Sequence, residues 1–301
     1  MTSARKYNCV VLVKQVPDTH NVTSNAMKDD GTMNRAALPA IFNPEDLNAL
    51  EMALQVREQY GGTVTVITMG PPSAAEVLRA ALYRGADRVI LLSDKKFAGA
   101  DTLATSYALK CAIEKIGDYD LVFCGRQAID GDTAQVGPQT AEKLGLPQVT
   151  YADSIVNLEG DEVIVERAFP TGSELVKCTL PCLLTVVGSA NQPRPPSARK
   201  RIEYKLAATP LEYRGLLERR PEFPSEEALD AYLAARNLKI PIWSAADIRA
   251  EEDKIGLAGS PTQVYKVNFV VLETTESRQV PATQEGIAAL MQELVREYIV
   301  G

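Results

Sequence analysis

The chain has 301 residues, of which 46% are hydrophobic and 24% charged, and this is the composition of an ordinary globular protein. Asp and Glu outnumber Lys and Arg by 39 to 32, and the formal net charge of -7 argues against a dedicated nucleic-acid-binding protein. No apolar run approaches the roughly 18 to 20 residues that span a bilayer, and Lys14 interrupts the first apolar stretch too early for a signal peptide.

The first half of the chain alternates strand-like and helix-like segments. Apolar, β-branched runs predict strands, and amphipathic runs bounded by caps and glycines predict the helices between them. The strands are expected at residues 7–16, 63–69, 88–92 and 120–124, and the helices at residues 44–60, 73–84, 101–115 and 133–144. This order predicts a Rossmann-like, doubly wound α/β fold, in which helices cover both faces of a mostly parallel sheet.

The second half begins with a different pattern. A turn signal joins two short runs, and two further apolar runs follow. These predict a β-hairpin extension and two more strands, at residues 155–157, 162–167, 174–179 and 183–188. Residues 1–190 are therefore expected to form one α/β domain.

The remaining segments lack such a pattern of packed elements. Residues 191–201 are rich in proline and arginine and are expected to form a mobile, solvated loop that contacts a partner. Two short helical patterns follow in residues 206–236, and Ser225 is suited to cap the second. We expect residues 191–237 to form this loop and a helical insertion. Residues 238–301, which end in an amphipathic helix, are expected to form an arm that lies on another protein.

Cysteine and histidine usage excludes several chemistries. The five cysteines contain no C-x-x-C pair, and their odd number is typical of reduced thiols in a cytoplasmic protein. Cys124, at a strand end, is expected to be a small buried residue rather than a reactive thiol. His20 is the only histidine, which excludes most zinc sites and the usual Ser-His-Asp and Cys-His groups. A solvated loop histidine is favoured over a catalytic one, so we expect no catalytic residue and no metal site.

Several common nucleotide-binding and hydrolytic motifs are missing. The first strand leads into Lys14-Gln15-Val16-Pro17-Asp18 without the G-x-G-x-x-G fingerprint of dinucleotide-binding folds. The sequence also contains no G-x-x-x-x-G-K-[ST], no G-x-S-x-G and no H-E-x-x-H. The chain is therefore expected to bind a ligand without the common machinery for hydrolysis.

The richest segment is the glycine-containing loop at residues 125–138, which follows the fourth strand and leads into a helix. Asp132 is suited to cap that helix, and Gln135 completes a spacing like that of a capping box. The backbone N–H groups of residues 131–134, aided by the helix dipole, are expected to hold a pyrophosphate, and Arg126 can supply charge. The alternative, which residue chemistry alone leaves open, is a capped helix after a glycine turn that binds nothing.

Three other segments at strand ends have the same character. Residues 43–46, 68–71 and 99–106 are small and polar, and each stands at the start of a predicted helix. Each alone is explained as a helix cap, with Asn43 in the first segment and Asp101 or its neighbour in the third. Together they indicate an adenine-nucleotide pocket, because ligands of such sheets bind at the carboxyl ends of the strands, where the strand order reverses.

Three motifs carry a resemblance to a known family. They are V-K-Q-V-P-D-T at residues 13–19, F-N-P-E-D at residues 42–46, and residues 125–138 followed by G-L-P-Q at residues 145–148. The sequence resembles the beta subunit of electron transfer flavoproteins. The resemblance covers about residues 7–200 and resumes at residues 239–264.

The resemblance implies an electron carrier subunit rather than a stand-alone enzyme. Such a beta subunit pairs with a homologous alpha subunit that holds a further FAD, and its C-terminal arm wraps around this partner. The heterodimer passes electrons between flavin dehydrogenases of the acyl-CoA dehydrogenase class, NADH or ferredoxin, and a membrane quinone reductase. The resemblance implies no membrane insertion and no nucleic acid.

Ordinary beta subunits hold a structural AMP, whereas the electron-bifurcating or Fix-like branch holds FAD in the same pocket. Residues 101–106, 130–137 and 259–264 look like the FAD-holding branch. The expected function is therefore an FAD-binding carrier subunit with electron bifurcation or confurcation, and the alternative is an ordinary beta subunit with AMP.

By position, the resemblance also implies a set of cofactor-binding residues. Asn43 would bond the adenine edge, and Thr105 would lie nearer the flavin end. The full set is Leu12, Asn43, Asp46, Met69, Asp101, Thr105, Gly125, Arg126, Gln127, Asp130, Gly131, Asp132, Thr133, Ala134, Gln135 and Val136.

The sequence departs from the family in two places. In the partner-recognition loop, at about residues 190–201, Pro195-Pro196 replaces the usual aromatic and small pair. Residues 206–236 look like an insertion. Two other hypotheses are a nucleotide-binding regulator that holds AMP without redox work, and an enzyme of the ATP-pyrophosphatase type. The latter needs a phosphate loop near the first strand, and none follows Val16.

Overall fold

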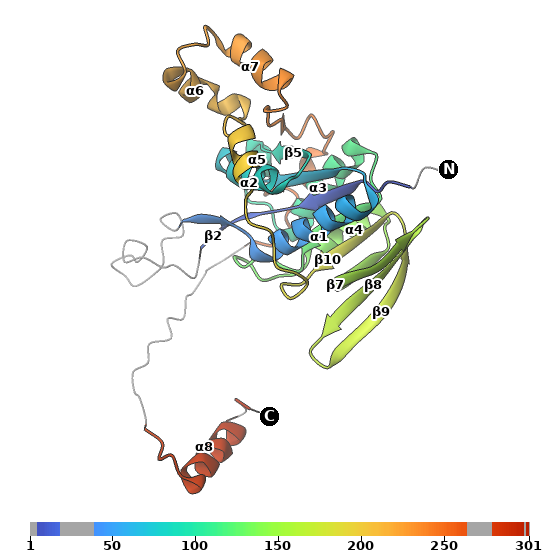
Figure 1. Cartoon of the computed structure of the whole chain (residues 1–301), viewed down its shortest axis with the longest axis vertical. Helices are drawn as coiled ribbons and strands as arrows, with labels where there is room; N and C mark the ends of the chain where they lie inside the picture. Colours follow the sequence, from blue (N-terminus) through green and yellow to red (C-terminus); the bar gives the residue numbers. More distant parts are fainter. Residues whose placement is uncertain (1–4, 19–38, 264–278, 298, 301) are drawn as a thin grey trace. The chain divides into compact units, whose positions relative to one another are not determined.

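The computed structural model describes residues 5–18, 39–263, 279–297, 299 and 300. The chain divides into two compact units, residues 1–265 and residues 266–301, and each is described by itself (Figure 1).

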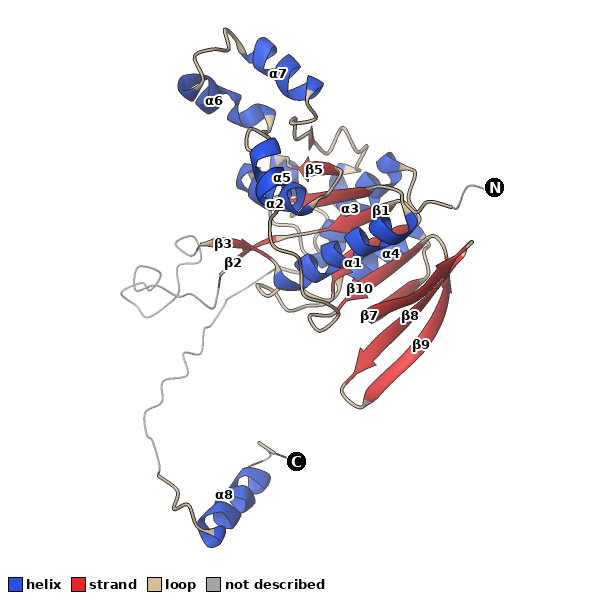
Figure 2. Cartoon of the chain, in the orientation of Figure 1, coloured by secondary structure: helices blue, strands red, loops and turns tan. Residues whose placement is uncertain are grey.

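A nine-stranded sheet forms the centre of the first unit (Figure 2). Its strands lie in the order β11 (Ile242–Trp243), β5 (Arg88–Leu92), β4 (Val64–Met69), β1 (Cys9–Leu12), β6 (Leu121–Gly125), β10 (Cys182–Val186), β7 (Gln148–Glu159), β8 (Glu162–Phe169) and β9 (Gly172–Thr179). All neighbours from β11 to β7 are parallel, and β8 and β9 continue the sheet as an antiparallel meander. The predicted doubly wound fold and its hairpin extension are confirmed.

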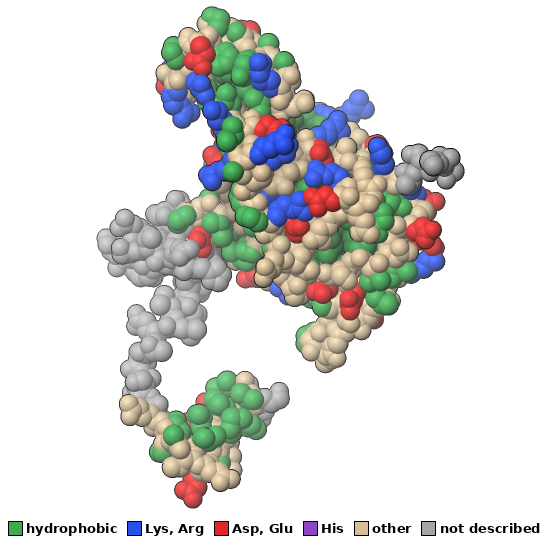
Figure 3. All heavy atoms as spheres, viewed as in Figure 1, with side chains coloured by type: hydrophobic (Ala, Val, Ile, Leu, Met, Phe, Trp, Pro, Cys, Tyr) green, Lys and Arg blue, Asp and Glu red, His purple; other side chains and the backbone are tan. Residues whose placement is uncertain are grey.

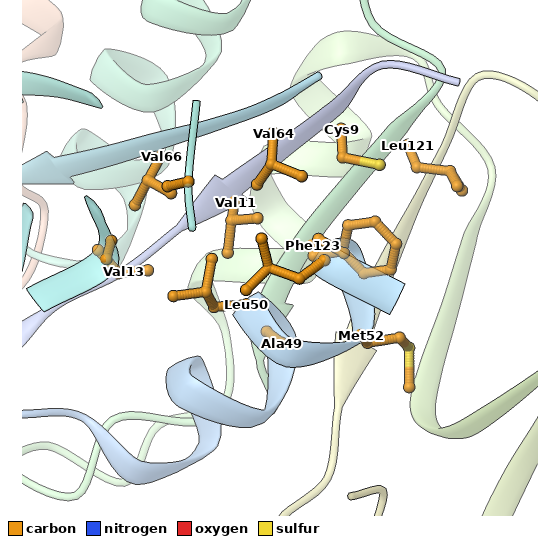
Figure 4. Close-up of a cluster of buried hydrophobic side chains, with 14 of the residues drawn as sticks. Cys9, Val11, Val13, Ala49, Leu50, Met52, Val64, Val66, Leu121 and Phe123 are labelled. Carbon is orange, nitrogen blue, oxygen red and sulfur yellow. The ribbon is translucent and has the colours of Figure 1, made fainter. Parts of the chain in front are cut away.

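Helices cover both faces of the sheet, and the two faces of β1 show how. Val11 packs with Leu50 in a cluster beneath α1 (Pro44–Tyr60) and α2 (Ala75–Arg84), as Figure 4 shows for α1. Val10 belongs to a second cluster beneath α3 (Thr102–Ile116) and α4 (Val136–Leu144). Because both faces are buried, the parallel strands read as continuous apolar runs rather than as alternating ones. Short 3-10 helices lie at Pro72–Ala74, Lys95–Phe97, Pro210–Glu212 and Glu252–Lys254.

The predicted strand at residues 7–16 is divided in two. After β1, the backbone N–H of Lys14 donates to the carboxylate of Asp46 and leaves the ladder. The chain then forms β2 (Gln15–Pro17), which pairs in antiparallel fashion with β3 (Ala40–Phe42). The expectation for His20 falls between β2 and β3, outside the described residues.

The proline- and arginine-rich segment is largely exposed and irregular up to Ser197, as expected, but it is also anchored to α1. Arg194 forms ion pairs with Glu51 and Glu58 of α1, and the Glu51 side chain is buried. The guanidinium therefore neutralises a buried carboxylate, which would be costly to leave unpaired. The short helix α5 (Ala198–Glu203) also begins inside the segment, with the side chain of Ser197 as its N-cap.

The predicted insertion forms a helical hairpin with a small core of its own. It comprises α6 (Tyr213–Arg219) and α7 (Glu226–Ala235), and Ser225 caps α7 as predicted. The core contains Ala208, Tyr213, Leu229, Leu233 and Leu238. Leu211, just before α6, is 62% exposed.

The C-terminal region is divided between the two units. The arm was expected to begin at residue 238, but β11 pairs with β5, and Ile240, Ala245 and Ile255 are buried in the first unit. In the second unit the structure describes α8 (Gln284–Arg296), which the side chain of Thr283 caps.

We predict that Gly137→Ala destabilises the fold. A Cβ at this position in α4 would lie 2.7 Å from Cys124 Sγ and 2.8 Å from Thr185 Cγ2, so the strand and helix must move apart. The unfolding free energy should fall by about 1–3 kcal/mol in urea denaturation followed by circular dichroism.

The matched control is Gly215→Ala in α6, where a Cβ would meet nothing within 4 Å. Here alanine should raise the unfolding free energy by about 0.5–1 kcal/mol. Equal effects of the two substitutions would contradict the close contact of α4 with β6 and β10.

Candidate functional site

The candidate site lies at the carboxyl ends of β1 and β6. From β1 the sheet continues through β4 and β5 on one side and through β6 and β10 on the other, so the strand order reverses here. This is the position at which open α/β sheets bind their ligands. Lys14 follows β1, residues 126–135 follow β6, and α1 begins beside both.

Asp46 connects these three elements. Its buried carboxylate accepts the backbone N–H of Lys14 at 2.8 Å and that of Gly125 at 2.9 Å. Gly125 is required by the same contact, because a Cβ there would lie 2.6 Å from Asp46 Oδ1. Burial raises the pKa of Asp46 to about 7, against the opposing effect of these hydrogen bonds.

Asn43 and Glu45 hold the loop at residues 126–135 rather than their own helix. Asn43 was expected to cap α1, but its side chain donates to the carbonyl of Gln127 at 2.9 Å and accepts from the N–H of Ile129 at 3.1 Å. Glu45 accepts the N–H of Gln127 at 2.9 Å and pairs with Arg126 at 2.9 Å. Asn43 thus stands at the N-cap position as predicted, but the expectation that its side chain caps α1 is wrong; its contact with an adenine edge stays a prediction.

The capping prediction for Asp132 and Gln135 is wrong as well. Asp132 and Ala134 have φ values of 49° and 53°, in the left-handed region, so the helix cannot begin at Thr133. The Asp132 carboxylate accepts from the side chain of Gln127 at 3.0 Å. Gln135 accepts from the hydroxyl of Thr102 at 2.9 Å, and α4 begins at Val136.

This loop conformation leaves a run of backbone N–H groups available. The N–H groups of Gly131 and Asp132 both donate to the carbonyl of Ala128. In contrast, the N–H groups of the next five residues have no hydrogen-bond partner within the described parts of the chain; these are Thr133, Ala134, Gln135, Val136 and Gly137. An uncapped helix N-terminus with free N–H groups is suited to bind an anion. Of the predicted donors at residues 131–134, Thr133 and Ala134 are therefore free, and the run of free groups continues to Gly137.

The two cations beside the loop are already paired. Lys14 lies 2.7 Å from a carboxylate oxygen of Asp130, and Arg126 pairs with Glu45. The Nε atom of Arg126 is buried and has no hydrogen-bond partner among the described residues, and its guanidinium lies 5.8 Å from the centre of the Tyr151 ring. An anion at this site would therefore be held mainly by backbone N–H groups. No cluster of potential metal ligands occurs among the residues described.

The N-terminus of α3 lies on the other side of the loop. Asp101 caps α3, as predicted, by accepting the N–H groups of Leu103 and Ala104 at 2.9 and 3.0 Å. Its second oxygen holds Thr262, so residues 101–106 and 259–263 lie together. Val264, the last residue of the predicted segment 259–264, lies outside the described residues.

The other predicted residues lie at the same edge of the sheet. Leu12 is buried at the end of β1, and Met69 is half-buried at the end of β4. Thr105 is half-buried in the second turn of α3. Cys124 is buried beneath α4, and burial raises the pKa of its thiol, as expected for a small core residue. Whether these side chains contact a nucleotide stays a prediction.

Sequence reasoning placed Glu45 and Gly137 in the segments of the site, at residues 43–46 and 125–138, but missed what they do there. Glu45 stands in the first turn of α1, where an acidic residue is favourable for local reasons, so its position gives no sign of a distant partner. The N–H of Gly137 was missed because α4 was expected to begin at Thr133. The sequence did offer one signal, because glutamine is a poor N-cap residue. Gln135 before α4 therefore indicates a helix start whose N–H groups are left free.

Comparisons with known proteins point to one family. Residues 30–210 match the model of the electron transfer flavoprotein domain. The chain is 41% identical over 293 residues to the electron transfer flavoprotein subunit beta of Thermoanaerobacterium thermosaccharolyticum, with 97% of this chain and 100% of the relative covered. It is 44% identical over 265 residues to protein FixA of Azorhizobium caulinodans, with 86% and 83% covered. It is 43% identical over 258 residues to the caffeyl-CoA reductase-Etf complex subunit CarD of Acetobacterium woodii, with 85% and 86% covered.

We predict that Asp46 makes the stability of the protein depend on pH. Its pKa is raised from 3.8 to about 7 in the folded state, so the folded protein binds the proton more tightly than the unfolded chain. The resulting stabilisation is complete below pH 3.8 and is lost as the pH rises through about 7. The unfolding free energy of the wild type, minus that of Asp46→Asn, should therefore be larger at about pH 5 than at about pH 8.

Urea denaturation of both proteins across this range measures the difference. Asn at position 46 carries no titrating charge, so other groups cancel in the comparison. A difference that is constant, or that grows with rising pH, would contradict the raised pKa.

Proposed function

The chain belongs to the electron transfer flavoprotein family, and we propose that it is the beta subunit of a heterodimeric electron carrier that holds FAD at the ends of β1 and β6. The observation that carries this proposal is the run of free N–H groups at residues 133–137, at the position where an open α/β sheet binds a nucleotide. These groups are suited to hold the pyrophosphate, with Arg126 beside them.

The chain's own residues position and surround the cofactor. FAD, when bound, supplies the redox chemistry, and the protein supplies binding, orientation and electrostatics. Glu45 and Asn43 hold residues 126–129 in place by hydrogen bonds. Asp46 in turn binds α1 to the ends of β1 and β6. The loop and the edge of the sheet are therefore held in fixed positions on one side of the proposed cofactor.

FAD is favoured over AMP by the polar groups beyond the phosphate site. Residues 101–106 and 259–263 lie together beside the loop, and both segments look like the FAD-holding branch. An AMP site would not need this second group of elements. FixA of Azorhizobium caulinodans and CarD of Acetobacterium woodii are similar to the chain over most of its length, and CarD is named as a subunit of a caffeyl-CoA reductase-Etf complex. These similarities support electron bifurcation or confurcation as the finer assignment.

The proposed stable partner is a homologous alpha subunit with its own FAD. Transient partners are a flavin dehydrogenase of the acyl-CoA dehydrogenase class, NADH or ferredoxin, and a quinone reductase. The described helices include none that is long and apolar enough to cross a membrane. The five cysteines are unpaired and buried, as a reducing cytoplasm would require.

Cofactor content of the purified heterodimer tests this function. We expect two flavins per heterodimer, measured by visible absorbance and by chromatography after acid extraction, and no AMP. One flavin with one AMP would replace the proposal by an ordinary beta subunit, and one flavin without a nucleotide would remove the site.

Gly131→Val locates the cofactor in the same experiment. A Cβ at Gly131 would meet nothing within 4 Å, so valine should leave the melting temperature unchanged while it fills the approach to the free N–H groups. The variant heterodimer should retain one flavin. Gly131→Ala, which adds less volume in the same place, should retain more, and full retention in the valine variant would move the pocket elsewhere.

We further predict that α8 contributes to binding the alpha subunit. Ile287, Met291 and Val295 recur at helical spacing and are exposed within the second unit, whose surface over α8 is largely hydrophobic in Figure 3. Ile287→Ser with Met291→Ser should weaken the heterodimer at least tenfold in a titration by light scattering or calorimetry. Ala289→Ser, on the opposite face of α8 and also exposed, should leave the affinity within about twofold, and equal effects would contradict the role.

A further inference from the structure

Asp101 uses its two carboxylate oxygens for different tasks. Oδ1 accepts the N–H groups of Leu103 and Ala104 and so caps α3. Oδ2 accepts from the hydroxyl of Thr262 at 2.7 Å and from the N–H of Thr262 at 3.2 Å. The N–H of Asp101 donates to the hydroxyl of Ser260 at 2.8 Å. One residue therefore binds the start of α3 to a segment about 160 positions away, which we call the strap (residues 256–262).

The strap is fitted closely at its beginning and fixed by polar bonds at its end. A Cβ at Gly256 would lie 2.0 Å from the carbonyl oxygen of Lys96, and Ile255 is buried in the core. Ser260 donates its hydroxyl proton to the carbonyl of Gly256 at 2.7 Å, which closes a turn within the strap. Beyond this turn, Thr262 is exposed, and its bonds to Asp101 hold it at the start of α3.

The strap lies one element away from the free N–H groups of α4. Thr102, the first residue of α3, donates its hydroxyl proton to the side chain of Gln135, whose own N–H is one of those free groups. The order across this edge is therefore the α4 N-terminus, the α3 N-terminus and the strap. A ligand held by its phosphate at α4 reaches the strap only if it extends well beyond the phosphate.

We propose that Asp101 is a positioning residue that sets the preference of this pocket for FAD over shorter adenine nucleotides. This proposal rests on the proposed function of the site. Both oxygens of Asp101 are engaged by protein donors, so the residue acts through the strap and does not itself contact the cofactor. The strap would contact the riboflavin part of FAD, which AMP lacks, and Asp101 holds the strap in the position for this contact.

The substitution Asp101→Asn separates latching of the strap from capping of α3. The remaining oxygen of asparagine still accepts from Leu103 and Ala104, since asparagine is as good an N-cap as aspartate. Its amide nitrogen, however, faces the N–H of Thr262, so that hydrogen bond is lost, and the Thr262 hydroxyl must turn to accept from the amide; the bonding of the strap is therefore weakened. In the heterodimer, FAD should dissociate about tenfold faster, as the loss of one charge-assisted hydrogen bond implies.

Two further measurements identify the mechanism. After removal of flavin, the affinity of the pocket for AMP, measured by calorimetry, should change by less than about twofold, because AMP does not reach the strap. Hydrogen exchange should be faster for the peptide that contains Thr262 in the variant. Thr262→Val, which removes the hydroxyl but keeps the N–H bond, should show an effect of the same kind and serves if Asp101→Asn folds poorly.

Asp120→Asn is the matched control. Asp120 also accepts a distant N–H, that of Asn8, with one oxygen and pairs with Arg5 through the other. It precedes β6, at the end of the strands opposite the candidate site, so its substitution should leave FAD dissociation unchanged.

The outcomes distinguish this inference from the proposed function. If the wild-type heterodimer binds AMP but no second FAD, the proposed function fails, and the role of Asp101 fails with it. If the wild type holds FAD but Asp101→Asn loses FAD and AMP equally, or releases FAD at the wild-type rate, only the inference is overturned.

Discussion

One buried carboxylate determines the arrangement of the candidate site. Asp46 accepts N–H groups from Lys14 and Gly125, and so ties the first turn of α1 to the ends of β1 and β6. These are the two strands at which the sheet order reverses, so the contact fixes the spacing of the crevice itself. Burial of the Asp46 carboxylate disfavours its charged form and therefore raises its pKa.

The position of α1 then decides how the loop after β6 is held. With Asp46 in place, Asn43 and Glu45 stand opposite residues 126–129 and bind three of their backbone groups. Glu45 also forms an ion pair with Arg126, and Asp130 forms one with Lys14. Both nearby cations are therefore neutralised by the protein itself. Recognition of an anion depends on oriented backbone dipoles more than on net charge, which agrees with a chain that is acidic overall.

The sequence allowed the fold to be predicted more fully than the site. The period of the apolar runs and the glycine stops identified the doubly wound sheet, because burial of both faces leaves a strong local signal. Asn43 and Asp132 were misjudged because Asn and Asp at helix starts favour capping locally, whereas here distant or neighbouring loop groups compete for the same oxygens. The C-terminal strap, and the pairing of β11 with β5, depend on contacts between residues more than 140 positions apart and leave no periodic pattern.

The contrast between α3 and α4 explains where a phosphate would bind. Both helices begin at the same edge of the sheet, yet the carboxylate of Asp101 caps the N-terminus of α3, whereas the first N–H groups of α4 have no partner among the described residues. A carboxylate at α3 repels a second anion there, and an open N-terminus at α4 attracts one. Asp101 also holds the strap through Thr262. The same carboxylate therefore disfavours a phosphate at α3 and positions the strap next to α3. The pocket is thus polarised along the edge of the sheet, with the anion-binding end at α4 and the remainder of the ligand directed past α3.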